Sequence, residues 1–212
     1  MENSIFWLFY IILIFWSIYQ KWDEKQEKYI SHPHLTSLYF LGASSVLLIF
    51  FPHALSFFTY DIIGIFIFIG IILFTYIVYK VLRLISNQES NWFFYDYIQL
   101  LDSRFILPKL FEIIFQQIAF VSVLVLAISS FGEAVTLLAT VFVFVLAHLN
   151  LFLFRSIRES VFYLLFSIIG APIFVLLLIN TESLWYSISV HMLFYTLLAM
   201  SAWSWGVIKS GK

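Results

Sequence analysis

The sequence predicts an all-α, polytopic membrane protein with about seven transmembrane helices, and three observations lead to this class. The 212-residue chain is 63% hydrophobic and only 11% charged, and its mean hydropathy is +1.00. A soluble domain of this size does not reach such values. Apolar runs of about 17–25 residues, the length needed to cross a bilayer, recur along the chain. On the resulting map, all 11 Lys and Arg residues fall on one side of the membrane.

The apolar runs alternate across the bilayer. They cover residues 4–20, 35–57, 62–82, 109–130, 134–154, 160–180 and 184–208. The loops that follow the second, fourth and sixth runs contain no Lys or Arg, so the positive-inside rule predicts an outside N-terminus and a cytoplasmic C-terminus. The richness in Phe, Ile and Leu is typical of an AT-rich prokaryotic genome, and we therefore expect a prokaryotic cytoplasmic membrane. The basic residues form no patch, which argues against nucleic-acid binding.

We divide the chain into three parts. Residues 1–85 are expected to form a three-helix membrane scaffold, because their runs are apolar and contain small residues at which helices can approach closely. Residues 86–108 group five aromatic side chains with polar residues at helical spacing, which predicts an amphipathic helix in the cytoplasmic interface. This segment is interpreted either as an aromatic anchor or as a gate over a cavity. Residues 109–212 are expected to form a four-helix core.

The first run of the core contains a carboxylate and two amides. A charge inside a spanning helix costs at least ~2.5 kcal/mol, so Glu112 must have partners or stay protonated. Gln116 follows Glu112 by one helical turn and shares its face, and Gln117 is the next residue. Pro108 suits the first turn of this helix, whereas Pro172 should kink the run in which it lies. The helix therefore turns a polar stripe toward something other than lipid.

The other ionisable groups within the core are His148 on its second run and His191 and Tyr195 on its last. Such groups indicate a functional site by default, and the alternative is a hydrogen-bond network that only joins helices. A carboxylate beside a neutral imidazole can remove a proton from water, and a second His with a Tyr hydroxyl can stabilise an oxyanion. Glu112 and the two histidines are also a zinc ligand set, but no His-Glu-x-x-His pair lies on one helix. We therefore expect no cofactor, with zinc as the alternative.

Two stretches of the core carry short motifs. The first is Phe144-Val145-Leu146-Ala147-His148, and the second is the run Thr181-Glu182-Ser183-Leu184-Trp185, followed by His191. These stretches resemble the CAAX protease and bacteriocin-processing (CPBP) family of intramembrane endopeptidases. Its four-helix core carries Glu-Glu-x-x-x-Arg, Phe-x-x-x-His and His-x-x-x-Asn on successive helices, and a Thr-Gly-Ser-Leu-Trp run precedes the last histidine. The resemblance extends from about Pro108 to Met200.

The first and third motifs depart from the family. If Phe115 matches the Phe that often precedes the family's Arg, Glu112 takes the place of the second glutamate, and Phe111 and Gln116 replace the first glutamate and the Arg. A shift of one residue instead puts Glu112 in the catalytic place, with Ile113 second and Gln117 at the Arg position. In both registers the first motif keeps one carboxylate. Tyr195 stands where the family has Asn, and its hydroxyl can also donate to an oxyanion.

The resemblance implies an intramembrane endopeptidase that cleaves a membrane-associated peptide or protein. The implied roles are Glu112 as general base, His148 positioning the water, His191 and Tyr195 stabilising the oxyanion, and Gln116 or Gln117 orienting Glu112. The alternative is a catalytically inactive relative whose core is a binding scaffold for a partner protein. A third hypothesis, a small transporter with a proton relay, is less favoured because the runs show no repeat symmetry.

Overall fold

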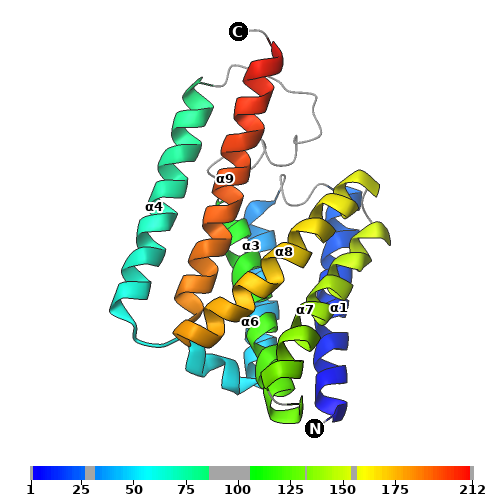
Figure 1. Cartoon of the computed structure of the whole chain (residues 1–212). Coiled ribbons are helices and arrows are strands. Elements are labelled where there is room, and N and C mark those ends of the chain that lie inside the picture. Colours follow the sequence, from blue (N-terminus) through cyan, green and yellow to red (C-terminus); the bar gives the residue numbers. More distant parts are fainter. Residues whose placement is uncertain (1, 27–31, 86–105, 132, 154–156, 211–212) are drawn as a thin grey trace.

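The structure, a computed structural model of the chain, describes residues 2–26, 32–85, 106–131, 133–153 and 157–210. These residues contain helices and no strand, which confirms the all-α class. Figure 1 shows the helices packed into one bundle, with the start of α1 and the end of α9 at opposite ends. The elements are α1 (Glu2–Gln26), α3 (Pro33–Phe50), η1 (Pro52–Phe57), α4 (Ile62–Ile85), α6 (Ile106–Phe131), α7 (Glu133–Leu149), η3 (Asn150–Leu153), α8 (Ile157–Thr181) and α9 (Leu184–Ser210).

Each long helix of the described residues coincides with one of the predicted apolar runs, but the helices differ in how much apolar length they provide. Four contain a stretch long and apolar enough to cross a membrane: Pro33–Phe50, Ile62–Leu82, Ile106–Ile128 and Ser160–Thr181. Shorter apolar stretches occupy Tyr10–Tyr19, Val141–Leu153 and Leu184–Leu198. The chain is thus a helical, membrane-embedded protein with four candidate spans, and the total of seven stays a prediction.

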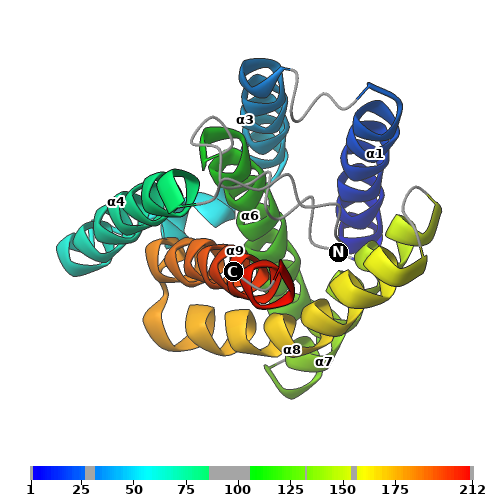
Figure 2. The ribbon, with the colours of Figure 1, turned by 90° about the horizontal axis from the view of Figure 1, so that it is seen from above.

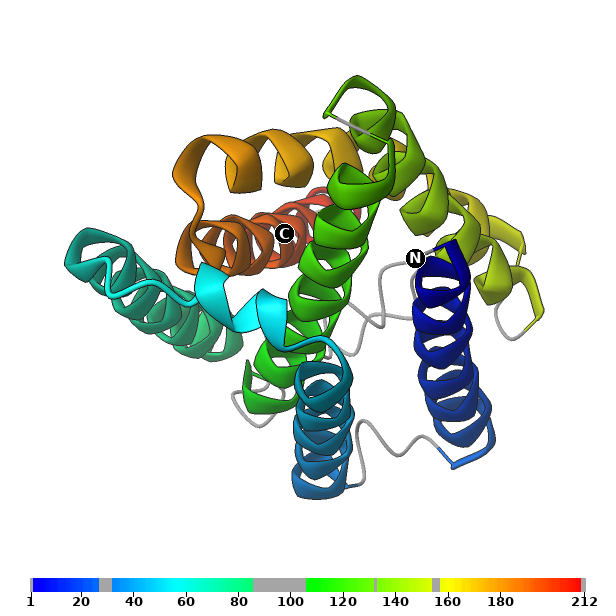
Figure 3. The ribbon, with the colours of Figure 1, turned by 90° about the horizontal axis from the view of Figure 1, so that it is seen from below.

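Helix α6 lies at the centre of the bundle. Figures 2 and 3 show it in the middle, with α1, α3, α7 and α9 around it and α4 at the edge beside α9. Of an 18-residue apolar window within Ile106–Ile128, 67% is buried inside the protein, against 17% of such a window within Ile62–Leu82 of α4. Protein contacts on all sides of α6 explain how a helix with a carboxylate and two amides can sit among apolar neighbours, because its polar groups face protein and not lipid.

The second predicted run, 35–57, was too long for one helix. Helix α3 ends at Phe50, and Phe51 leaves the helical region with φ −130° and ψ 66°. The cause is Pro52, which disfavours helical dihedrals in the residue before it. Pro52 begins η1, a 3-10 helix that packs against α6. Pro172, by contrast, lies inside α8, and that helix continues past it to Thr181.

The predicted parts of the chain share one hydrophobic core. Helix α3, from the predicted scaffold 1–85, packs against α6, and buried side chains from α1 to α9 belong to a single cluster. Of the predicted interfacial segment 86–108, residues 86–105 lie outside the described residues. The remaining three residues, which include Pro108, form the first turn of α6, so this helix begins before Lys109.

Helix α4 is attached to the bundle mainly through α9. Near its start, Gly64 approaches α9 so closely that an added Cβ would lie 3.2 Å from Cβ of Trp185 and 2.9 Å from a carboxylate oxygen of Asp61. The indole of Trp185 donates a hydrogen bond to the carbonyl of Thr59 (2.9 Å). Farther along, the hydroxyls of Thr75 and Thr196 form a buried hydrogen bond of 2.8 Å. These contacts fix α9 lengthwise against α4 and the segment that precedes it.

Candidate active site

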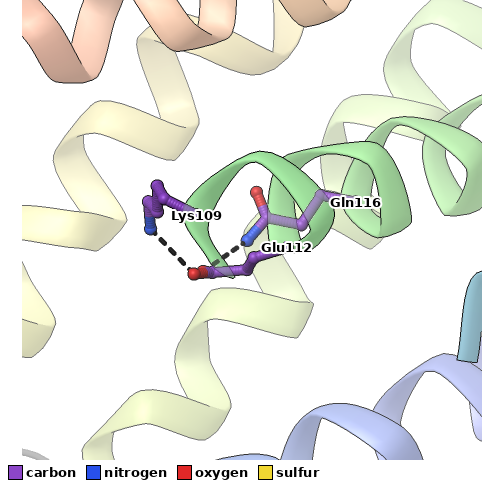
Figure 4. A network of polar contacts seen from close by, with 3 residues as sticks. All are labelled: Lys109, Glu112 and Gln116. Carbon is purple, nitrogen blue, oxygen red and sulfur yellow. Dashed lines mark hydrogen bonds and ion pairs between the residues drawn. The ribbon is translucent and has the colours of Figure 1, made fainter. Parts of the chain in front are cut away.

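Glu112 lies on the second turn of α6 and is almost completely buried, with 5% of its surface exposed. Its Oε2 atom forms an ion pair with Lys109 Nζ at 3.0 Å, and its Oε1 atom accepts a hydrogen bond from Gln116 Nε2 at 3.1 Å. Figure 4 shows the three side chains on one face of the helix. The spacing explains the arrangement, because residues three and four apart are neighbours on a helix. The carboxylate thus has the partners that its burial demands.

The hydrogen-bond partner of His191 is Gln117, the second amide side chain of α6. Gln117 Nε2 lies 2.9 Å from His191 Nδ1, and the Ser187 hydroxyl donates a short hydrogen bond to Gln117 Oε1. Ser187 and His191 are one turn apart on α9, so both reach the same amide. Gln117 and Ser187 are fully buried, and His191 is 7% exposed. This three-residue chain joins α6 to α9.

The ring of Tyr195 connects the His191 chain to the Glu112 group. It stacks on the His191 ring with centroids 5.3 Å apart and an interplanar angle of 15°. Lys109 Nζ lies 3.9 Å from the Tyr195 ring centroid, a cation–π contact made by the ammonium that also binds Glu112. The His191 ring also packs against the Phe174 ring of α8, with the two centroids 4.8 Å apart. Lys109 is therefore shared between the carboxylate of α6 and the aromatic pair of α9.

His148 enters the group from α7. Its Nδ1 atom lies 2.8 Å from the backbone carbonyl of Phe144, one turn earlier. Because a carbonyl oxygen can only accept, Nδ1 carries the proton of this bond, and Nε2 of the neutral ring is left with a lone pair. The first and last residues of the Phe-x-x-x-His motif are therefore joined by a hydrogen bond, and Nε2 has no hydrogen-bond partner among the described residues.

A cavity of about 30 Å³ lies beside His148, between α1, α6 and α7. A water molecule needs roughly 10–15 Å³ of such space, so the volume has room for about two waters. A bound water also needs polar partners. Gln116 and His148 are the polar residues of the cavity lining, but almost all of the surface that faces the cavity is apolar. The lining residues are Ile12, Trp16, Phe115, Gln116, Ala119, Val123, Val143, Phe144, Ala147 and His148.

The candidate residues thus come together from α6, α7 and α9, but not in the pairs that the sequence suggested. Of the two amides considered as partners of Glu112, Gln116 binds it and Gln117 binds His191. Within the described ranges, Glu112 makes no hydrogen bond to either histidine.

Sequence reasoning missed two members of this group. Lys109 was assigned to the cytoplasmic flank of a span, yet it is 9% exposed and binds Glu112. Ser187, one of several serines near the start of α9, was not among the predicted site residues. Both could have been found by helical spacing, since Lys109 precedes Glu112 by three residues and Ser187 precedes His191 by four.

No part of the described chain gathers three or more His, Cys, Asp or Glu side chains in a position to hold a metal ion. The zinc alternative for Glu112, His148 and His191 therefore gains no support from their arrangement. Each of the three side chains has a different nearest partner: an ammonium, a backbone carbonyl and an amide.

In comparisons with known proteins, the chain matches no protein-family model, no curated protein and no solved structure.

Proposed function

We propose that this chain is an intramembrane endopeptidase of the CPBP type, which hydrolyses a peptide bond of a membrane-associated protein or peptide. The observation that carries the proposal is that Gln116 binds Glu112 and, together with His148, lines a cavity of about 30 Å³. A carboxylate, an amide and an imidazole thus come together beside a space with room for about two waters. Apolar helices shield this group, which strengthens every electrostatic interaction within it.

In the proposed reaction, His148 Nε2 holds the attacking water and Glu112 acts as the general base. The water oxygen forms a bond to the carbonyl carbon of the substrate while its proton passes to the base. The carbon–nitrogen bond then breaks, and the proton moves to the leaving amine. His191 and the Tyr195 hydroxyl supply the donors for the oxyanion of the tetrahedral intermediate. No covalent enzyme intermediate and no metal is needed for this sequence of steps.

The turn between α8 and α9 also supports the resemblance on which the proposal draws. Glu182 stands at the place of Gly in the family's Thr-Gly-Ser-Leu-Trp run, and it is the one non-glycine residue of the described chain with a positive φ, 50°. Residues other than glycine adopt this left-handed region at a cost. The turn thus keeps the backbone conformation that a glycine would provide, although the glycine itself is absent.

The test compares the protein termini of membranes and culture medium by mass spectrometry in cells with the wild type, Glu112→Gln or His148→Ala at equal expression. We expect both variants to accumulate an uncut precursor, because each removes a group that activates the water. Glu182→Gln is the matched control: it also neutralises one carboxylate, but at an exposed turn outside the group, and it should leave the termini unchanged. Wild-type termini in both site variants, with folded protein in the membrane, would contradict the proposal.

A second function, a binding scaffold without catalysis, is favoured by one specific observation. The Lys109–Glu112 ion pair neutralises the carboxylate and joins it to Tyr195, as expected for groups that only hold helices together. The scaffold hypothesis predicts that Glu112→Gln keeps partner binding and that no termini change. Crosslinking of the intact protein in membranes, followed by identification of the bound partner, would then separate the two functions.

A further inference from the structure

The two histidines of the candidate site differ in the partner of their Nδ1 atom. His148 Nδ1 faces a backbone carbonyl, which can only accept, and His191 Nδ1 faces the side-chain amide of Gln117. An amide can either donate through nitrogen or accept through oxygen, so the orientation of Gln117 decides which ring nitrogen of His191 carries the proton.

In the structure, Gln117 turns Oε1 toward Ser187, whose hydroxyl donates to it, and turns Nε2 toward His191 Nδ1 at 2.9 Å. The direction of the Ser187–Gln117 bond therefore sets the orientation of the amide. Nδ1 of His191 then accepts, and the proton of the neutral ring sits on Nε2. The amide and the serine are fully buried, so no bulk water competes for these bonds. Ring contacts with Tyr195 and with Phe174 also hold the His191 ring in its orientation.

We propose that Ser187 and Gln117 are positioning residues that hold His191 in its Nε2–H tautomer and so make it a hydrogen-bond donor. The two imidazoles then have complementary roles, since Nε2 of His148 accepts and Nε2 of His191 donates. Neither Nε2 atom has a hydrogen-bond partner in the part of the chain that the structure describes. The catalytic value of this arrangement rests on the proposed hydrolysis, in which one histidine holds water and the other donates to an oxyanion.

The tautomer can be measured without any substrate. In protein labelled with ¹⁵N-histidine and reconstituted in membranes, the nitrogen chemical shifts of His191, assigned with His191→Gln, report which ring nitrogen is protonated. We expect an unprotonated Nδ1 in the wild type. In Gln117→Glu, whose side chain has nearly the same shape but can only accept when ionised, Nδ1 should become protonated. A protonated Nδ1 in the wild type, or an unchanged Nδ1 in Gln117→Glu, would overturn the assignment.

Two further variants guard against a folding defect in Gln117→Glu. Ser187→Ala removes the donor that orients the amide and should give a mixture of both His191 tautomers, whereas Ser187→Thr keeps a hydroxyl and should restore the single Nε2–H form. Gln116→Leu is the matched control, because it removes the neighbouring amide of α6 and should leave the His191 shifts unchanged. A single tautomer in Ser187→Ala would remove Ser187 from the proposal.

Cleavage kinetics separate this inference from the proposed function. Loss of one oxyanion donor lowers kcat on the order of 10²-fold. We expect Gln117→Glu and Ser187→Ala to lower kcat more than they raise KM, with Ser187→Thr close to wild type. If the tautomer changes as expected but cleavage does not, His191 has no oxyanion role and the proposed mechanism fails while the tautomer assignment stands.

Discussion

Helix α9 meets two of its neighbours, α4 and α6, in different ways. Toward α4 two of its polar side chains are bonded: the Trp185 indole binds the Thr59 carbonyl, and the Thr196 hydroxyl is bonded to Thr75. The hydroxyl of Ser189, one turn after Trp185, is buried without a hydrogen-bond partner among the described residues. Toward α6 its polar contacts are satisfied only in part, because His191 uses Nδ1 for Gln117 and leaves Nε2 without a partner among the described residues. The Tyr195 ring meets Lys109, but no hydrogen bond of its hydroxyl is found within the described ranges.

This difference separates helix attachment from the proposed functional site. Inside a membrane, hydrogen bonds between helices stabilise association when both groups are satisfied. Buried ionisable groups that keep a free donor or acceptor are costly and are candidates for a functional site. The threonine pair toward α4 therefore needs no function to explain it, whereas the proposed function rests on the histidine and the tyrosine toward α6. Mutations on the two faces should consequently differ in how much they lower stability and in whether they affect cleavage.

The largest effect on stability is expected at the α6 face, from Lys109→Met. This change removes the ammonium but leaves the buried carboxylate of Glu112 with only Gln116 as partner. Removal of one member of a buried ion pair costs about 3–5 kcal/mol, because an uncompensated charge remains. Unfolding in detergent micelles, followed by circular dichroism against denaturant, should show a loss of this order.

The double variant Lys109→Met/Glu112→Met is the control for this prediction. Replacement of both members of a buried pair by apolar residues is often neutral or stabilising, so the double variant should recover most of the loss. If Lys109→Met alone unfolds like the wild type, the Glu112 carboxyl does not depend on the Lys109 ammonium, and the ion pair does not stabilise the α6 face.

These buried pairs also show what sequence reasoning could and could not reach. Apolar runs gave the helices nearly in register with the structure, because a bilayer demands a fixed length of apolar residues. The polar residues of α6 and α9 were identified for the same reason, since lipid makes each of them costly. Pairing between helices was not accessible, because it depends on the depth at which α9 lies beside α6. That depth places His191 opposite Gln117 and Tyr195 beside Lys109.

A second limit concerns residues assigned by a single rule. Lys109 was counted among the charges of the cytoplasmic flank, and the positive-inside rule cannot tell a lysine at the membrane surface from one that turns inward to a carboxylate. Pro52 shows the same limit for length, because hydropathy continues through 35–57 although the α-helix ends at Phe50. Local backbone chemistry decided the helix end, and side-chain pairing decided the place of the lysine.

On the α4 face, the threonine pair should give a smaller and asymmetric effect. The Thr196 hydroxyl donates to the Met192 carbonyl at 2.9 Å, so in their mutual bond the Thr75 hydroxyl is the donor. Thr196→Val leaves that donor unsatisfied and should cost up to about 1.7 kcal/mol. Thr75→Val leaves Thr196 bonded and should cost only about 0.6 kcal/mol. The same unfolding assay measures both, and neither variant should change substrate cleavage.

A double-mutant cycle sharpens this result. Thr75→Val/Thr196→Val replaces both hydroxyls with methyl groups of similar shape and should cost less than the sum of the single variants. Equal costs for the two single variants would mean that Thr75 has another acceptor and that the direction of the bond is wrong. A loss of cleavage in either one would remove the distinction between the two faces of α9.

The smallest effect is expected where α4 begins, and it depends on pH. Asp61 precedes α4, and Oδ1 accepts the N–H of Ile63 at 3.1 Å. The Tyr186 hydroxyl, and then the backbone N–H groups of Gly64 and Ile63, hold the pKa of the Asp61 carboxyl below its usual value. A folded pKa below the unfolded value of about 3.9 means that the stabilisation is present above that pH and is lost as pH falls through the folded pKa.

Hydrogen exchange in the first turn of α4, corrected for the intrinsic rates, should therefore rise below about pH 4 in the wild type. In Asp61→Asn it should already be faster at neutral pH and should change little with acid. A wild-type profile in Asp61→Asn would show that Trp185 and Gly64 hold this end of α4 by packing alone, which would leave the α4 face of α9 without a titratable contact.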